Sequence, residues 1–386
     1  MSVVTIPLAA APNEMVQEEI LKLVAHVSRD VAAPRFLENG AVLGFDYLGE
    51  EGNREAIRAE VEAVATKIQR SLRRLERKVV HRTPTGWDRR PGEVTTEGTG
   101  IWVSGQGQVQ LSDGALRASR RLGRLLDEYM AAWKPVPLQT PTLIPAPVLA
   151  RCDYFRSFPQ YVSFVSHLHE DFATISDFRE RHQERETLDE QSRADLDLPG
   201  TCLSPAVCYH VYHRHAGHAA PAEGLTYDVQ GRCFRFESTN LSDLRRLWEF
   251  TMRELVFVGT REWVLAQREA AIAAFIPVLD ALGLPAEIRT ASDPFFVAPD
   301  ATAKTYFQLS SETKYEISVA LEGEERLAVG SFNYHTDFFG RAFETPVDGG
   351  DPAHSVCVAF GIERLVHAIL AHHGSDPAGW PAALQG

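Results

Sequence analysis

The fold is decided by residues 227–259, which read Tyr-Asp-Val-Gln-Gly-Arg-Cys-Phe-Arg-Phe-Glu-Ser, then Thr-Asn-Leu-Ser-Asp-Leu-Arg-Arg, then Leu-Trp-Glu-Phe-Thr-Met-Arg-Glu-Leu-Val-Phe-Val-Gly. Two runs in which apolar and polar residues alternate flank a polar, arginine-rich loop. This pattern predicts a long antiparallel hairpin. Arg235 and Glu237 share one face of the first strand, and Phe250 shares one face of the second with Glu254. We expect these four side chains on one side of the hairpin.

These residue types suit a nucleotide. Guanidinium binds phosphate through two hydrogen bonds, an aromatic face stacks on a base, and a carboxylate binds an ammonium group or a metal. The same alternation of Arg and Glu is also common on a solvated strand face, so the spacing leaves both interpretations open.

The hairpin resembles motif 2 of class II aminoacyl-tRNA synthetases, with Phe234-Arg-Phe-Glu237 before the loop and Phe250-Thr-Met-Arg-Glu254 after it. The seryl type is the most similar variant. Further resemblances follow in the same order along the chain. Leu203–Cys208 is similar to the seryl-type segment that recognises the amino acid, Ser331–Arg341 to the seryl-type Ser-Asn-x-x-Asp-Phe-x-x-Arg segment, and Ala359–Leu365 to motif 3.

Residues 113–133 have helical spacing, and residues 136–144 follow as a strand and a proline-containing turn. This pair resembles motif 1, which forms the dimer interface in that family, so the resemblance implies a homodimer. Helices and strands mix without strict alternation, which predicts an α+β fold. We expect a class II synthetase-like antiparallel sheet flanked by helices over residues 113–386. A smaller, mostly helical N-terminal region with a short hairpin is expected over residues 1–112.

Composition limits the function. The chain has 386 residues and a net charge of −13, which argues against broad nucleic-acid affinity because phosphate neutralisation needs a basic surface. Five cysteines, an odd number, favour a reducing compartment over a disulfide scaffold. No run approaches the roughly 20 apolar residues of a membrane span. The start lacks a basic signal-peptide region. A soluble, cytoplasmic protein without a membrane partner is predicted.

A basic helix stands out in this acidic chain. Residues 53–79 have helical periodicity, and one face carries cations that include Arg73 and Arg74. A solvated helix face is one interpretation of this charge run, and a docking surface for an acidic partner is the other.

Cys208 departs from the seryl pattern, which has a glutamate at that position to bind the substrate ammonium. From spacing alone the cysteines are read as small buried apolar residues, because Cys208, Glu254 and Cys357 are 46 and 103 residues apart. The Cys–Glu–Cys set, however, resembles the atypical seryl-tRNA synthetases of methanogens and the amino acid:[carrier protein] ligases. This resemblance implies one zinc ion per chain, held by these three residues, with an open position for the substrate amine. Cys152, Cys202 and Cys233 are then structural.

The layout resembles the carrier-protein ligases, which keep a synthetase core without a tRNA-binding domain. The resemblance implies that ATP, with magnesium, activates a small amino acid, glycine or alanine, as an aminoacyl-adenylate. A phosphopantetheine thiol on a carrier protein then takes the aminoacyl group. No stable nucleic-acid partner is expected.

The resemblance also implies roles for single residues. Arg235 is the catalytic group and holds the α-phosphate, Phe250 stacks on adenine, Glu237 accepts from its amino group, and Arg364 covers its other face. Ala206 and Asn333 are candidate substrate-binding residues. The magnesium ligand of the seryl family falls on Leu327, which leaves Glu316 and Asn333 as candidates.

Alternative functions remain open from the sequence. One is seryl-type tRNA aminoacylation, against which the net charge of −13 weighs. The other is a non-catalytic synthetase paralogue that senses amino acids or regulates a partner. Such proteins usually lack the motif 2 or motif 3 arginine, and Arg235 and Arg364 are both present.

Overall fold

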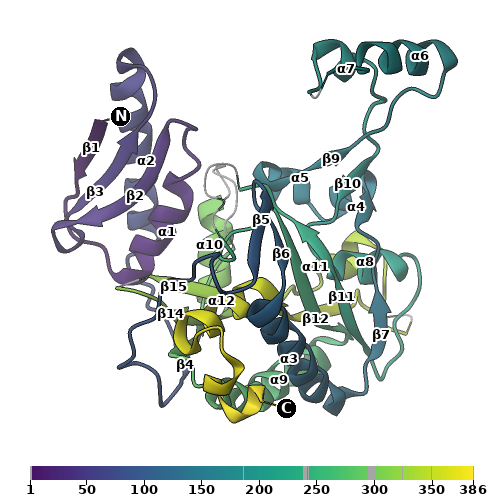
Figure 1. Ribbon diagram of the computed structural model, residues 1–386. Coiled ribbons are helices and arrows are strands. Elements are labelled where there is room, and N and C mark those ends of the chain that lie inside the picture. The colour runs from purple at the N-terminus through teal and green to yellow at the C-terminus, as the bar shows by residue number, and fades with distance from the viewer. Residues whose placement is uncertain are drawn as a thin grey trace.

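The computed structural model describes residues 2–185, 187–237, 241, 243–293, 301–323, 325–348 and 350–385, with the backbone alone at residues 301 and 302. Its main body is a large sheet flanked by helices (Figure 1). The strands lie in the order β4 (Val79–Arg82), β13 (Ala286–Thr290), β14 (Lys314–Ala320), β15 (Arg326–Tyr334), β16 (His354–Gly361), β12 (Glu249–Gly259), β11 (Leu225–Phe234) and β7 (Val136–Gln139). β7 runs parallel to β11, and the other neighbours are antiparallel. The expected α+β architecture is confirmed.

The predicted hairpin lies inside this sheet. β11 and β12 pair from Leu225 opposite Val258 to Phe234 opposite Glu249. Residues 238–240 and 242 of the loop between them lie outside the described residues. On its other side β12 pairs with β16. The hairpin therefore sits between two further strands, which holds its side chains in fixed positions.

Alternating side chains of the sheet serve two different cores. On one face, Leu255 and Phe257 pack with the helices α3 (Asp113–Met130), α9 (Arg261–Ala281) and α12 (Ile362–His373). On the other face, Met252 and Val256 pack with a smaller layer. That layer contains α4 (Ala146–Arg151), α5 (Tyr154–Ser157), α8 (Cys208–Arg214) and α11 (Phe338–Ala342), with a small sheet of β8 (Leu143–Pro145), β10 (Thr201–Leu203) and β9 (Phe164–Val165).

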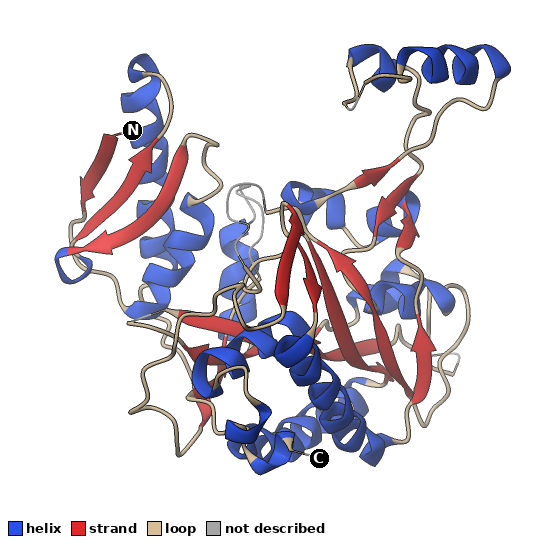
Figure 2. Ribbon diagram, viewed as in Figure 1, coloured by secondary structure: helices blue, strands red, loops and turns tan. Residues whose placement is uncertain are grey.

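The N-terminal region forms a unit of its own beside the main body (Figure 2). It contains β1 (Ser2–Pro7), α1 (Glu14–Val24), β2 (Val31–Leu37), β3 (Val42–Tyr47) and α2 (Arg54–Leu72), with sheet order β1-β3-β2. These strands correct the expectation of a mostly helical region. β2, with the sequence Val-Ala-Ala-Pro-Arg-Phe-Leu, carries a proline and lacks the period of two that identifies a strand. The short hairpin of β5 (Ile101–Gly105) and β6 (Gln108–Leu111) was predicted and is present.

The connection from this unit to the main body begins before residue 112. β4 pairs with β13, and the Gly92 amide donates to the Ala371 carbonyl at 2.7 Å. The chain thus contacts the large sheet from Val79 onward, while the division at residue 112 stays a prediction.

Figure 1 shows the helices α6 (Phe172–Arg181) and α7 (Glu190–Ala194) away from the main body, beyond the small sheet. In the described part of the chain, no helix combines the length and the apolar character needed to cross a bilayer.

Arg253 joins the hairpin to α3, and its removal should destabilise the fold. Its guanidinium donates to Asp228 at 2.9 and 2.5 Å, to Asp127 at 2.6 Å and to the Gly123 carbonyl at 3.0 Å. Arg253→Ala leaves the mostly buried Asp228 unpaired, so we expect the free energy of unfolding to fall by about 3 kcal/mol in urea titrations. Arg120→Ala, at an exposed position of α3, should change it by under about 0.5 kcal/mol. Equal effects of the two substitutions would contradict this role.

Candidate active site

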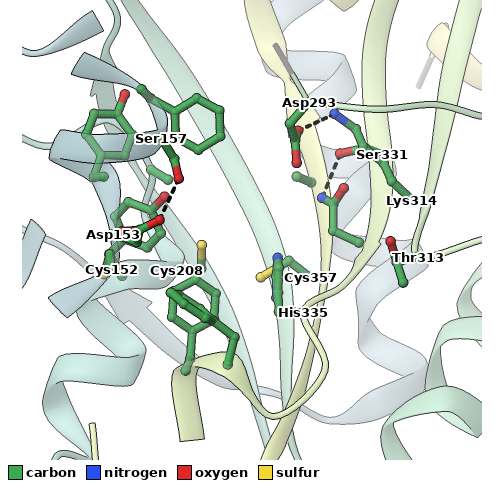
Figure 3. Close-up of a pocket in the computed structure, with 18 of the residues that line it drawn as sticks. Cys152, Asp153, Ser157, Cys208, Asp293, Thr313, Lys314, Ser331, His335 and Cys357 are labelled. Atoms are coloured by element: carbon green, nitrogen blue, oxygen red, sulfur yellow. Dashed lines mark hydrogen bonds and ion pairs between the residues drawn. The ribbon is translucent and has the colours of Figure 1, made fainter. Parts of the chain in front are cut away.

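The sheet face opposite α3, α9 and α12 holds a cavity of about 400 Å³ (Figure 3). Its walls come from α5, α8, the hairpin, β14 to β16, α11 and α10 (Ala301–Ser310). A smaller cavity of about 130 Å³ adjoins it. Both are lined by Arg235, Met252, Lys314, Ser331 and Ala359. Arg235 therefore stands where the two cavities meet.

The structure brings together the three predicted metal ligands in the larger cavity. Cys208 is the first residue of α8, Glu254 lies on β12 and Cys357 on β16. In the β12–β16 register Cys357 is opposite Val256, which shares a face with Glu254. One ligand atom from each of the three residues lies within 4.8 Å of the other two. Figure 3 shows the sulfurs of Cys208 and Cys357 at the same end of the cavity.

The chemistry of this set fits a divalent cation. All three residues are buried, and Glu254 Oε2 has no hydrogen-bond partner among the described residues. Burial raises the pKa of Glu254 and raises the pKa of Cys357 to about 11. The adjacent Cys357 thiol, together with burial, raises the pKa of Cys208. A bound cation would reverse these shifts, because it stabilises thiolate and carboxylate. Two sulfurs and one carboxylate oxygen, with bonds of about 2.0–2.3 Å, are a suitable set for zinc.

The four predicted nucleotide residues line the smaller cavity. They are Arg235, Glu237, Phe250 and Arg364. The Arg235 guanidinium carbon lies 5.5 Å from the centre of the Phe250 ring, and its Nε donates to the Pro205 carbonyl at 3.1 Å. Glu237 accepts from Arg246 at 2.9 Å. The cavity thus combines an aromatic ring, a carboxylate and two guanidinium groups.

Arg364 is positioned by its neighbours. Its Nε donates to the Arg245 carbonyl at 2.7 Å and its Nη1 to the Ala328 carbonyl at 3.1 Å. Burial lowers the pKa of Arg364, and the Glu237 carboxylate opposes this effect. The preceding residue, Glu363, accepts from the backbone amide of Thr251 at 2.7 Å and from its hydroxyl at 2.8 Å. These bonds tie the start of α12 to β12 and place Arg364 beside the cavity.

The remaining candidate residues, those for the substrate and for magnesium, lie in different cavities. Ala206 and Asn333 line the larger cavity, where the Asn333 amide donates to Ser331 Oγ at 2.9 Å. Glu316 lines the smaller cavity, opposite Ser331 in the β14–β15 register. Of the two magnesium candidates, Glu316 lies with the nucleotide residues and Asn333 does not.

A set of polar residues from α10 and the elements around it lines the larger cavity, and no local sequence pattern predicts this set. From α10, Lys304 donates to Asp153 at 3.2 Å and to Ser157 at 2.8 Å on one wall. On the opposite wall the Gln308 amide donates to Asp293 at 2.7 Å. Lys314 also donates to Asp293 at 2.6 Å. No local motif in the sequence surrounds Asp293 that could have indicated these contacts.

Comparison with known proteins gives relatives in sequence, although no protein family model matches the chain. It is 41% identical over 244 residues to amino acid–[acyl-carrier-protein] ligase 2 of Bradyrhizobium diazoefficiens, a match that covers 61% of this chain and 70% of the relative. It is 35% identical over 271 residues to ligase 1 of the same organism, covering 69% of this chain and 79% of the relative. The type-2 serine–tRNA ligase of Methanopyrus kandleri is 28% identical over 262 residues, covering 64% of this chain and 50% of that protein.

Solved structures share the fold. The M. kandleri seryl-tRNA synthetase, in its complex with a tRNASec from A. aeolicus, superposes with a TM-score of 0.70 at 21% identity over 99% of this chain and 76% of that chain. The seryl-tRNA synthetase of Pyrococcus horikoshii, complexed with ATP, gives a TM-score of 0.57 at 17% identity over 86% of this chain and 78% of its own. The expected class II synthetase-like fold is confirmed.

Asp293 should make stability depend on pH. Burial alone would raise its pKa, but the Lys314 ammonium and the Gln308 amide lower it to about 2. Because the unfolded chain binds this proton near pH 3.9, the contribution is present above that pH and is lost as pH falls toward 2. The side chain is 34% exposed, so solvent screening limits the contribution to about 1 kcal/mol.

Asp293→Asn should remove this contribution. We expect urea unfolding at pH 7 to show a less stable variant, and the difference from the wild type to shrink below pH 3. Asp376→Asn, near the C-terminus, is the control. A constant difference at every pH would show that the carboxylate charge of Asp293 is not responsible.

Proposed function

This chain belongs to the amino acid–[acyl-carrier-protein] ligases, and we propose that it uses ATP to join a small amino acid to the phosphopantetheine thiol of a carrier protein. The observation that supports this function best is the pair of adjoining cavities that share Arg235. The larger contains Cys208, Glu254 and Cys357, which suit an amine bound through a metal. The smaller contains Phe250 and Arg364, which suit adenine. The substrate carboxylate and the α-phosphate would then meet at Arg235.

The first step is adenylation. A carboxylate oxygen of the amino acid attacks the α-phosphorus of ATP, the bond from that phosphorus to the bridging oxygen breaks, and pyrophosphate leaves. Arg235 stabilises the negative charge that grows around the phosphorus. Phe250 and Arg364 hold the adenine between them, and Glu237 accepts from its amino group. Glu316 is our candidate ligand for the magnesium that accompanies ATP.

The second step transfers the aminoacyl group. The phosphopantetheine sulfur attacks the carbonyl carbon of the aminoacyl-adenylate, a carbon–sulfur bond forms, and the carbon–oxygen bond to AMP breaks. The thiol proton passes to solvent, and AMP leaves. The acceptor thiol must therefore enter the larger cavity.

Zinc is the metal that we assign to Cys208, Glu254 and Cys357. Two features support a bound cation there: the buried Glu254 Oε2 has no hydrogen-bond partner among the described residues, and the two thiols are adjacent to it. When bound, zinc would supply an open position for the substrate amino nitrogen. We infer glycine or alanine as the substrate, with Ala206 and Asn333 near the side chain. A homodimer through α3 and β7, and a cytoplasmic location, also stay predictions.

Pyrophosphate exchange tests the activity. We expect exchange of labelled pyrophosphate into ATP that depends on a small amino acid, measured across all amino acids. Arg235→Ala should lower this exchange at least about 100-fold, the usual cost of losing a group that binds transition-state charge. Arg214→Ala, at an exposed position at the end of α8, should leave it unchanged. Exchange that survives Arg235→Ala would contradict the assignment.

The acceptor distinguishes the possible enzymes. Holo-carrier protein should become aminoacylated and tRNA should not. Charging of tRNA would favour the seryl-type alternative, and the absence of exchange with every amino acid would favour a non-catalytic paralogue.

Metal content tests the zinc site. The purified protein should contain about one zinc per chain by elemental analysis, because three buried ligands and one open position suit this ion. Cys208→Ala and Cys357→Ala should each lower the zinc content by at least tenfold. Cys202→Ala, at a buried cysteine of the small sheet, should retain it. Equal zinc content in all three variants would place the metal elsewhere.

A further inference from the structure

The cationic side chains in the two halves of α2 differ in whether they form ion pairs. In the first half each arginine has an acidic partner nearby in the chain: Arg54 pairs with Glu51 at 3.0 Å and Arg58 with Glu55 at 2.8 Å. The second half and the residues directly after it form what we call the basic end of α2: Lys67, Arg70, Arg73 and Arg74. All four are exposed. Within the described ranges, no carboxylate pairs with Arg70, Arg73 or Arg74, so these three guanidinium groups are available to a partner.

The helix dipole accounts for only part of this cluster. Arg70 lies in the last turn of α2 and Arg73 at its C-cap, where a cation interacts favourably with the dipole, but at an exposed position this effect is at most about 1 kcal/mol per charge. Like charges at a spacing of three or four residues, such as Arg70 and Arg74, repel each other. The protein as a whole carries a net charge of −13. Three arginines on an acidic protein, with no carboxylate partner among the residues that the structure describes, match an external acidic surface.

The exposed face of α2 is also hollowed. A shallow groove runs along it beside the basic end and is lined in part by Ala59, Ala63, Thr66, Lys67, Arg70 and Ser71. Small side chains at a spacing of three to four residues share one face of a helix, and they allow another helix to approach closely. The same surface therefore has a groove whose shape suits a helix and a positive charge that suits acidic side chains.

The basic end of α2 lies beside a helix that leads to the active site. Lys78, just after it, pairs with Glu312 at 2.7 Å, and Leu309 of α10 is buried in the same cluster as Ile68 and Leu72 of α2. Farther back on α10, Lys304, Phe307 and Gln308 line the larger cavity. Leu309 and Lys304 are five residues apart, about 7.5 Å along a helix axis. A protein seated at the basic end would therefore be close to the cavity that the acceptor thiol must enter.

We propose that the basic end of α2 docks an acidic helix of the carrier protein and so delivers the phosphopantetheine thiol to the larger cavity. The inference rests on the proposed function and extends it by assigning a role to the N-terminal unit. Steering by the three arginines raises the rate of productive encounter, and this effect weakens with salt. The chemistry of adenylation does not involve this surface.

An RNA would also be attracted by cations, but the observations favour a protein. RNA binding relies on many phosphate contacts, whereas this cluster is short and Glu62 also lines the groove. RNA binding is therefore an outcome of the test.

The test compares two acceptors in the full-length enzyme. The probes are a holo acyl carrier protein and free phosphopantetheine. We expect Arg70→Glu/Arg73→Glu/Arg74→Glu to lower kcat/KM for the carrier protein at least tenfold at low salt. The loss should shrink at high salt. Pyrophosphate exchange and transfer to free phosphopantetheine should stay within twofold of the wild type, which also shows that the variant is folded.

The matched control carries the same kind of change at the other end of the helix. Arg54→Glu/Arg58→Glu should leave carrier loading within twofold. Carrier loading unchanged in the triple variant would overturn the proposal, and so would equal losses with both acceptors. Salt-sensitive RNA binding that the triple substitution abolishes, with carrier loading intact, would assign the surface to RNA instead. A wild-type enzyme that loads no holo carrier protein would instead refute the proposed function, so the two failures are distinguishable.

Discussion

The candidate active site depends on the register in which β12 pairs with β16. Cys357 lies opposite Val256, so its thiol emerges on the face that also carries Glu254. A slip of one residue would turn Glu254 toward the helices and a neighbouring apolar side chain toward the cavity. The two cores on the sheet hold this register, because Leu255 and Phe257 must stay among α3, α9 and α12 while Met252 and Val256 stay on the other side. Packing at the sheet thereby assembles a ligand set from residues far apart in the chain.

The same register sets the electrostatics. Cys208, Glu254 and Cys357 are buried together with little to stabilise their charged forms, and burial favours their neutral forms. Arg235 stands next to them, at the boundary with the smaller cavity. A cation on one side of the substrate and a guanidinium on the other can hold an amino acid by its two ends, which leaves its carboxylate aligned for attack. The N-terminal unit contacts this arrangement through α10, whose residues line the larger cavity.

Much of the main body could be predicted from sequence, because its elements carry strong local patterns. The alternation in residues 227–259 identified β11 and β12, and the helical spacing of residues 113–133 identified α3. The predicted Arg235, Phe250 and Arg364 lie together because their motifs sit at strand ends of one sheet.

The strands of the N-terminal unit could not be predicted, since β2 lacks alternation and has its partner in β3. Asp293 and Lys314 were also missed, because their contact depends on how residues 291–293 continue from β13, and no local spacing encodes it. The convergence of the two cysteines with Glu254 followed from a family resemblance and not from any pattern in the chain.

X-ray absorption at the zinc edge tests the central claim most directly, because it reports the atoms bound to the metal. For protein as purified, we expect two sulfur neighbours near 2.3 Å and light-atom neighbours near 2.0–2.2 Å. Addition of the amino acid that the enzyme activates should change the shell of light atoms around zinc and leave both sulfur neighbours in place. A zinc ion with no sulfur neighbours, or with a shell that the amino acid does not change, would show that Cys208, Glu254 and Cys357 do not bind the substrate amine through zinc.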